Sequence, residues 1–174
     1  SSAPWSCTAA RSWASGWLSP QIGGKTIPQR NREFVFNHTS KDHTTYETPR
    51  RALYLPIIRN HLYDMLEQFD YPDPTMPTGS RNSTVIAPQA LIMMNSPVAM
   101  EAGKRLARRL EGVKDSSERI RQAYALLYGR DPAAKETARA LSLIRQLEAT
   151  EPTQRAWELL CHTLMAANEF SYLR

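Results

Sequence analysis

The chain has 174 residues and a formal net charge of +5, with 41% hydrophobic and 22% charged residues. This length suits one domain with a sizeable core and is too short for two ordinary ones. The charge is mildly basic, below the density typical of a dedicated nucleic-acid-binding protein. No apolar run approaches the roughly 18 residues that a membrane-spanning helix needs. Cys7 and Cys161 are too few for a disulfide scaffold or a four-cysteine metal site.

The first residues differ in character from the rest. Residues 1–14 hold two tryptophans among serines and alanines, without periodicity. They lack the basic start and the apolar centre of a signal peptide. We therefore predict that residues 1–14 are disordered or are a non-native start. Residues 15–174 are predicted to form a single domain, with a loop-rich half over 15–95 and a helical bundle over 96–174.

Proline placement separates these two halves. Ten of the twelve prolines precede residue 98, and proline interrupts helices by removing a donor and clashing with the preceding turn. Residues 53–58 are a short apolar run with a proline inside, which predicts an edge segment or a buried extended stretch. Residues 60–69 carry apolar side chains at helical spacing. Residues 88–95 are expected to form one short, thoroughly buried helix.

The helical half begins with two amphipathic helices. Ser96-Pro97 is a serine cap followed by proline at the first helical position, and this helix is expected to end at Gly112. Residues 115–118 have the spacing of a capping box, and the helix that follows is expected to end at Gly129.

Two further helices are expected to begin at the proline-containing segments 131–132 and 151–153. Each of the four apolar stripes is narrow, so we expect the helices to pack on one another as an antiparallel bundle. The predicted fold is therefore mainly α. The residues predicted to face inward are Ala99, Ala102, Leu106 and Leu110; Ile120, Ala123, Tyr124 and Leu127; Ala140, Leu143, Ile144 and Leu147; and Trp157, Leu160, Cys161 and Leu164.

A polar loop holds the candidate metal ligands. His38, Asp42 and His43 lie within six residues, and imidazole and carboxylate groups suit zinc and similar divalent ions. The alternative is a solvated loop whose side chains hydrogen-bond its own backbone. Short clusters of this kind are common by chance, which favours the solvated loop.

Arginines and aspartates form the candidate ligand-binding set, which consists of Arg51, Arg59, Arg81, Asp70 and Asp73. Arginine binds carboxylates through two parallel hydrogen bonds, so such a pair would hold the proline-rich loop against the helices. The same arginines could instead bind an anion such as sulfate, phosphate or a uronic acid of a glycan. Loop fixation is the favoured interpretation.

Two sets of residues could form exposed binding surfaces. Lys104, Arg105, Arg108 and Arg109 make a basic helix face that could touch nucleic acid or an anionic surface, although a solvated face is the commoner use. Tyr63, Phe69, Tyr71, Met76, Met93 and Met94 could form a docking surface, but we expect them in the core because methionine adapts to uneven cavities.

Long, ordered motifs along the chain resemble those of one known family. They occupy residues 31–42, 50–60, 69–74, 81–85, 87–91, 94–97, 128–132 and the ending 160–170. Over roughly residues 15–174 the chain is similar to the planctomycete-specific C-terminal domain of unknown function 1553, also called the planctomycete PSD1 domain. The family normally has a helix before the pattern at residues 15–24, which residues 1–14 do not supply. The chain is therefore expected to be a C-terminal fragment, or a reading frame with a misplaced start.

The resemblance implies a setting rather than a reaction. Members usually end large exported proteins that carry a second planctomycete domain and often a cytochrome-c-like haem domain. The resemblance implies an extracytoplasmic location, periplasmic or secreted. The chain itself shows no signal peptide, so this expectation depends on the resemblance alone. The haem motif Cys-x-x-Cys-His is absent, so no haem is predicted in this chain. A divalent metal is left open.

These features are compatible with two functions. The favoured one is a non-catalytic docking or ligand-recognition module whose partners are the upstream domains, an anionic ligand or a glycan. The alternative is a hydrolytic or redox enzyme site shared with upstream domains, to which His38, Asp42, His43 or Arg59 would contribute. A nucleic-acid partner rests on the net charge alone and is not expected.

Overall fold

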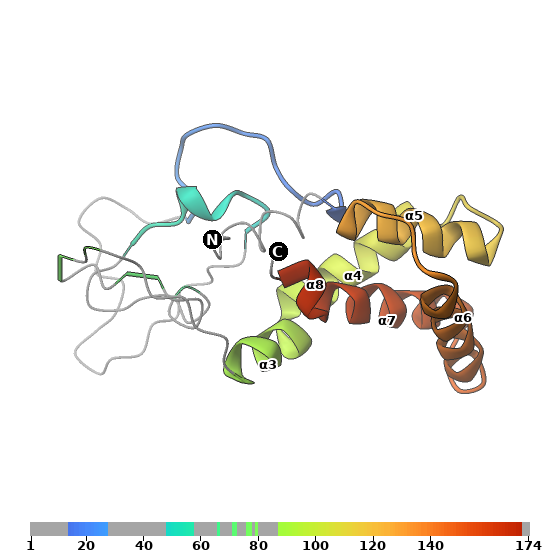
Figure 1. Ribbon diagram of the computed structural model, residues 1–174. Coiled ribbons are helices and arrows are strands. Elements are labelled where there is room, and N and C mark those ends of the chain that lie inside the picture. Colours follow the sequence, from blue (N-terminus) through green and yellow to red (C-terminus); the bar gives the residue numbers. More distant parts are fainter. Residues whose placement is uncertain are drawn as a thin grey trace.

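The computed structural model describes residues 14–27, 48–57, 66, 71–72, 76–77, 79 and 87–171. Within this part of the chain the regular structure is helical, without strands, and no helix is long and apolar enough to span a membrane. The mainly α prediction is therefore confirmed. The elements are η1 (Ala52–Tyr54), α3 (Ala87–Asn95), α4 (Pro97–Arg109), α5 (Ser116–Tyr128), α6 (Ala134–Glu148), α7 (Thr153–Ala166) and α8 (Asn168–Ser171), as Figure 1 shows.

Helices α4 and α7 form the centre of the helical half (Figure 1). α3, α6 and α8 all pack against α7, and α5 packs against α6. Gly103 lets the two central helices approach closely, because a Cβ atom built there would lie 2.9 Å from the Cβ of His162. The core between these helices is closed by large side chains with almost no exposure, among them Leu106, Leu110 and Met165.

The predicted apolar stripes are confirmed for α4, α5 and α7, whose named residues are all buried. In α6 only Ala140 and Ile144 are buried, while Leu143 and Leu147 are half-buried. The main packing partners of this helix in the described part of the chain are α5 and α7, and they leave Leu143 and Leu147 partly uncovered.

The helix starts follow local chemistry. The Ser96 hydroxyl accepts a hydrogen bond from the Ala99 N–H at 3.2 Å, and the Asp115 carboxylate accepts one from the Glu118 N–H at 2.8 Å. Gly129 ends α5 in the left-handed region, at φ 69°. The first helix is expected to end at Gly112, but α4 ends three residues earlier, at Arg109.

Two expectations for the middle of the chain are wrong. Residues 53–57 form neither an edge segment nor a buried extended stretch: a tight turn closed by the Tyr54 N–H and the Arg51 carbonyl oxygen, 2.9 Å apart, leaves Leu53 exposed. α3 is not thoroughly buried either. Met93 is buried, but Leu91 and Met94 are exposed, because the packing of α3 against α4 and α7 leaves these two side chains uncovered.

The predicted division at residue 14 stays a prediction, since residues 1–13 lie outside the described part. Ala14 itself is buried, and its carbonyl oxygen accepts a hydrogen bond from Arg109 Nη1 at 2.9 Å. Nearby, the Arg105 guanidinium lies 5.2 Å from the ring centroid of Trp17. Residues 14–17 are therefore attached to α4 through two of the arginines that the sequence placed on a solvated face.

Gly103→Ala tests the central contact. The new methyl group would meet the His162 Cβ at 2.9 Å and its Cα and backbone nitrogen at 3.1 Å, and the backbone cannot yield as a side chain does. We expect a loss of about 1–3 kcal/mol in the free energy of unfolding, measured by thermal or urea denaturation.

Gly112→Ala is the matched control, because Gly112 has open space around its Cβ position and no positive φ. It should leave stability within about 0.5 kcal/mol of the parent. Equal losses in the two variants would contradict the packing argument.

Candidate functional site

Most of the predicted metal-binding and ligand-binding residues lie outside the described part of the chain, so the metal and anion interpretations stay predictions. Arg51 is described and exposed. Within the described residues, no three His, Cys, Asp or Glu side chains come together as a metal site. The predicted site residues outside the described part are His38, Asp42, His43, Arg59, Asp70, Asp73 and Arg81.

Arg50, next to Arg51, is buried and joins two loops, residues 19–27 and 48–57. Its Nη1 donates hydrogen bonds to the carbonyl oxygens of Gly24 and Lys25, both at 3.2 Å. Its Nη2 donates to the carbonyl oxygens of Gln21, at 3.2 Å, and Gly23. One planar guanidinium therefore satisfies four backbone acceptors of a loop that has no regular structure.

The loop geometry depends on two glycines. Gly23 and Gly24 have φ of 69° and 83°, a region that favours glycine, and their carbonyl groups accept hydrogen bonds from Arg50. Further contacts join the two loops: the Arg50 guanidinium stacks over the Tyr54 ring, and the Thr26 hydroxyl donates to the Tyr54 carbonyl oxygen. We call residues 19–27 and 48–57 the Arg50 platform.

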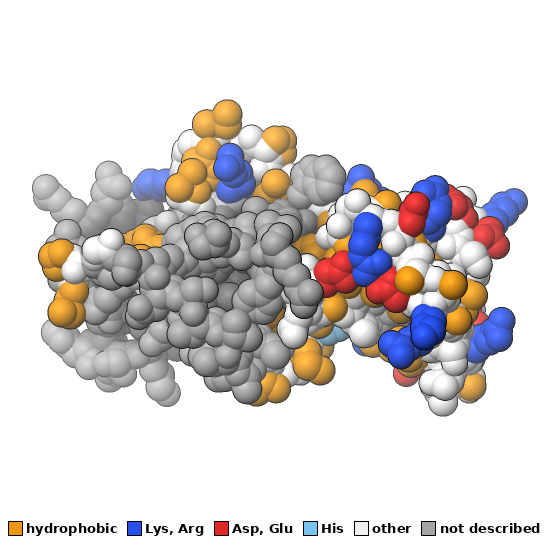
Figure 2. Space-filling model, in the orientation of Figure 1, with side chains coloured by type: hydrophobic (Ala, Val, Ile, Leu, Met, Phe, Trp, Pro, Cys, Tyr) orange, Lys and Arg blue, Asp and Glu red, His pale blue; other side chains and the backbone are white. Residues whose placement is uncertain are grey.

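The outward side of the Arg50 platform is apolar and basic. Ile22 is 86% exposed and Leu53 is 75% exposed. Lys25 and Arg51 are also exposed, and the platform sequence contains no aspartate or glutamate. Figure 2 shows apolar and basic side chains gathered on this projecting part of the molecule. The platform therefore presents apolar tips beside exposed basic side chains, on loops that Arg50 joins by hydrogen bonds.

A second exposed apolar surface runs along α3 and the start of α4. Leu91, Met94, Pro97 and Met100 follow one another at intervals of three residues, and all four are exposed. We call them the α3–α4 strip; apolar side chains at the lower edge of Figure 2, where α3 lies, belong to this region. Met93 fills the core as predicted, whereas the core prediction is wrong for Met94 and for Met76, which are exposed.

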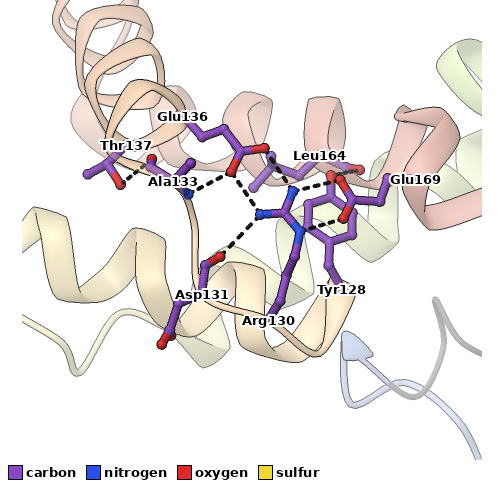
Figure 3. A network of polar contacts seen from close by, with 8 residues as sticks. All are labelled: Tyr128, Arg130, Asp131, Ala133, Glu136, Thr137, Leu164 and Glu169. Carbon is purple, nitrogen blue, oxygen red and sulfur yellow. Dashed lines mark hydrogen bonds and ion pairs between the residues drawn. The ribbon is translucent and has the colours of Figure 1, made fainter.

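Among the described residues, a dense polar cluster surrounds Arg130 (Figure 3). Its guanidinium forms paired hydrogen bonds with the carboxylates of Glu136, both at 2.8 Å, and Glu169, at 2.6 and 2.8 Å. The Asp131 carbonyl oxygen accepts from the same guanidinium at 3.1 Å, so each of its N–H groups has an acceptor. The cluster joins the end of α5 to the first turn of α6 and to α8.

Hydrogen bonds in this cluster shift the carboxylate titration. The Arg130 guanidinium and then the Ala133 N–H lower the pKa of Glu136 to about 2. The Arg130 guanidinium also lies over the rings of Tyr124 and Tyr128. The Tyr128 hydroxyl donates a hydrogen bond to the Leu164 carbonyl oxygen at 2.8 Å. Because its groups are mutually paired, we interpret the cluster as a fastening of helix ends rather than a reaction centre.

Cys161 is a core residue, as predicted. Burial raises its pKa to about 12, so the thiol is neutral and a poor nucleophile. The buried Arg119 lies beside this core, with its guanidinium 4.1 Å from the Trp157 ring centroid and Nη2 donating to the Ala107 carbonyl oxygen at 2.9 Å. Burial lowers the pKa of Arg119 from its usual value.

The sequence did not reveal these partners. Arg50 belongs to one of the family motifs, but nothing near it along the chain indicates an acceptor loop 25–29 residues away. The local signal that the sequence does carry here is the pair Gly23-Gly24 after Ile22, which is typical of a turn. The pairing of Arg130 with Glu169 has no local signature, because the two are 39 residues apart.

Arg50→Lys tests the loop fixation. Lysine keeps the charge but replaces the planar fork with a compact ammonium group, which cannot reach the four carbonyl oxygens together. We expect trypsin to cleave after Lys25 roughly tenfold faster under native conditions, because local opening governs cleavage. Arg51→Lys is the control and should cleave at the parent rate; equal rates in all three proteins would disprove the fixation.

Glu136→Gln tests the cluster through pH. A depressed pKa means that the carboxylate stabilises the fold above its usual pKa of 4.5 and loses this contribution as pH falls toward about 2. We expect the variant to lose about 1 kcal/mol at neutral pH, screened by solvent, and the difference to vanish near the lower pH. Glu118→Gln should lose less stability than Glu136→Gln, because Glu118 pairs with Arg121 inside one helix. A stability difference between the parent and Glu136→Gln that does not change with pH would contradict the role of the Glu136 carboxylate.

Comparison with known proteins identifies the family. Residues 9–144 match the family model PSD1, described as a protein of unknown function (DUF1553). No curated protein and no solved structure matches the chain. The match begins before residue 15, ends within α6, and includes the Arg50 platform, the α3–α4 strip and Arg130. It spans well over half of the chain, and the chain therefore belongs to the PSD1 family.

Proposed function

We propose that this domain is a non-catalytic docking module whose α3–α4 strip contacts an upstream domain of the same exported multidomain protein. The observation that carries the proposal is the exposure of Leu91, Met94 and Met100, at 57%, 54% and 44%. Contiguous exposed apolar residues mark interaction sites more often than scattered ones do. Methionine suits such a surface because its unbranched side chain adapts to the partner.

The strip rests on a firmly packed support. Met93, on the opposite side of α3, is buried, and its carbonyl oxygen lies 3.3 Å from His162 Nε2 on α7. The Ser96 cap fixes the junction between α3 and α4. A surface that is already ordered loses less conformational entropy when a partner binds, which favours docking.

The polar chemistry of the described residues also supports a structural role. Arg50, Arg119 and Arg130 are engaged with carbonyl or carboxylate oxygens, and the Cys161 thiol is buried and neutral. The alternative enzyme role depends on His38, Asp42, His43 or Arg59, all of which lie outside the described part of the chain.

The wider setting is part of the proposal. An extracytoplasmic location and an association with cytochrome-c-like domains rest on the family resemblance alone. We propose no cofactor held by this chain, and a divalent metal at the histidine loop stays a separate prediction.

Isothermal titration tests the docking directly. The titrant is the purified upstream region of a longer PSD1 protein that has apolar residues at the positions of Leu91, Met94 and Met100. We expect saturable binding to the parent chain. A Leu91→Gln/Met94→Gln double variant should bind at least roughly tenfold more weakly, because it keeps the helix but loses apolar contact area.

Leu53→Gln is the matched control, since Leu53 is equally apolar and exposed but lies on the Arg50 platform. It should bind as the parent does. Absence of binding to the parent, or equal affinity of the double variant, would refute docking through the strip.

A further inference from the structure

We propose that the Arg50 platform binds the surface of an anionic phospholipid bilayer, independently of docking through the α3–α4 strip. Ile22 and Leu53 are among the most exposed large apolar side chains of the described residues, and both lie in the loop segments of the platform. Apolar side chains that enter the boundary between headgroups and acyl chains provide one part of interfacial binding. The other part is attraction between basic side chains and anionic headgroups.

The charge of the platform fits this partner. Lys25 and Arg51 are exposed beside the apolar tips, and residues 19–27 and 48–57 contain no carboxylate that would repel a negative surface. Basic side chains near an anionic bilayer are attracted to its headgroups and add to the binding. The formal charge of +5 for the whole chain adds a long-range attraction of the same sign.

The buried guanidinium explains how a loop could enter a water-poor interface. Backbone carbonyl groups that lose water without gaining a partner carry a large energetic cost. Arg50 supplies hydrogen bonds to the carbonyl oxygens of Gln21, Gly23, Gly24 and Lys25, so these four acceptors do not depend on water. The same bonds hold the loop in shape before it meets the surface, which lowers the entropy lost on binding.

The form of the platform favours lipid over a protein partner. A specific protein interface uses about 20–30 residues on each side, whereas the platform offers a few apolar tips on a projecting part of the molecule (Figure 2). A bilayer surface needs only a small apolar insertion combined with charge.

Vesicle sedimentation with the full chain tests the proposal. The probes are vesicles of phosphatidylcholine alone and vesicles that also contain phosphatidylglycerol. We expect binding to the second kind only, weakening as salt concentration rises. Leu53→Gln keeps every charge and should bind roughly tenfold more weakly, because the apolar insertion is reduced. Arg51→Gln keeps the apolar tips and should also bind more weakly.

The Leu91→Gln/Met94→Gln double variant is the control and should sediment as the parent does. Failure of the parent to bind phosphatidylglycerol vesicles would overturn the proposal, as would equal binding of Leu53→Gln, which would show attraction by charge without insertion. Binding to a soluble glutamate–tyrosine copolymer but to no vesicle would assign the platform to an acidic protein and overturn it as well.

Discussion

The close approach of α4 to α7 at Gly103 and His162 is the contact from which the other helices take their positions. Large side chains close the interface, and α3, α6 and α8 then pack against α7. α4 also holds the preceding chain, since Arg109 donates to the Ala14 carbonyl oxygen. A side chain larger than hydrogen at residue 103 would collide with the Cβ and backbone of His162, so the contact between the two central helices would have to shift.

Besides this helix contact, three arginine side chains hold segments of the chain together through hydrogen bonds. Arg130 joins three helix ends through two carboxylates. The buried Arg119 stacks on Trp157 and donates a hydrogen bond to a backbone carbonyl oxygen. Arg50 holds a loop through hydrogen bonds to four carbonyl oxygens. Each also lies over an aromatic ring. A planar guanidinium combines a rigid set of donors with a weakly hydrated face, which suits segments that lack their own backbone pairing.

The two exposed surfaces differ in chemistry, and this difference motivates the two proposals. The α3–α4 strip is a line of adaptable apolar side chains on helices that are packed from behind. The Arg50 platform has exposed apolar tips, basic neighbours and carbonyl groups that are hydrogen-bonded to Arg50. A protein partner can follow the first surface along its length, whereas a bilayer requires only that the second be charged, apolar at its tips and independent of water.

Local chemistry in the sequence determined the helices of the C-terminal half. The Ser96 and Asp115 caps, the Gly129 stop and the apolar stripes act within a few residues, so their effect can be predicted without knowing the fold. The exposure of Met94 beside the buried Met93, the turn that exposes Leu53, and the pairing of Arg130 with Glu169 were decided by tertiary structure. The reason is that burial and long-range pairing depend on which elements lie alongside, and the order of residues along the chain carries no local signal for that.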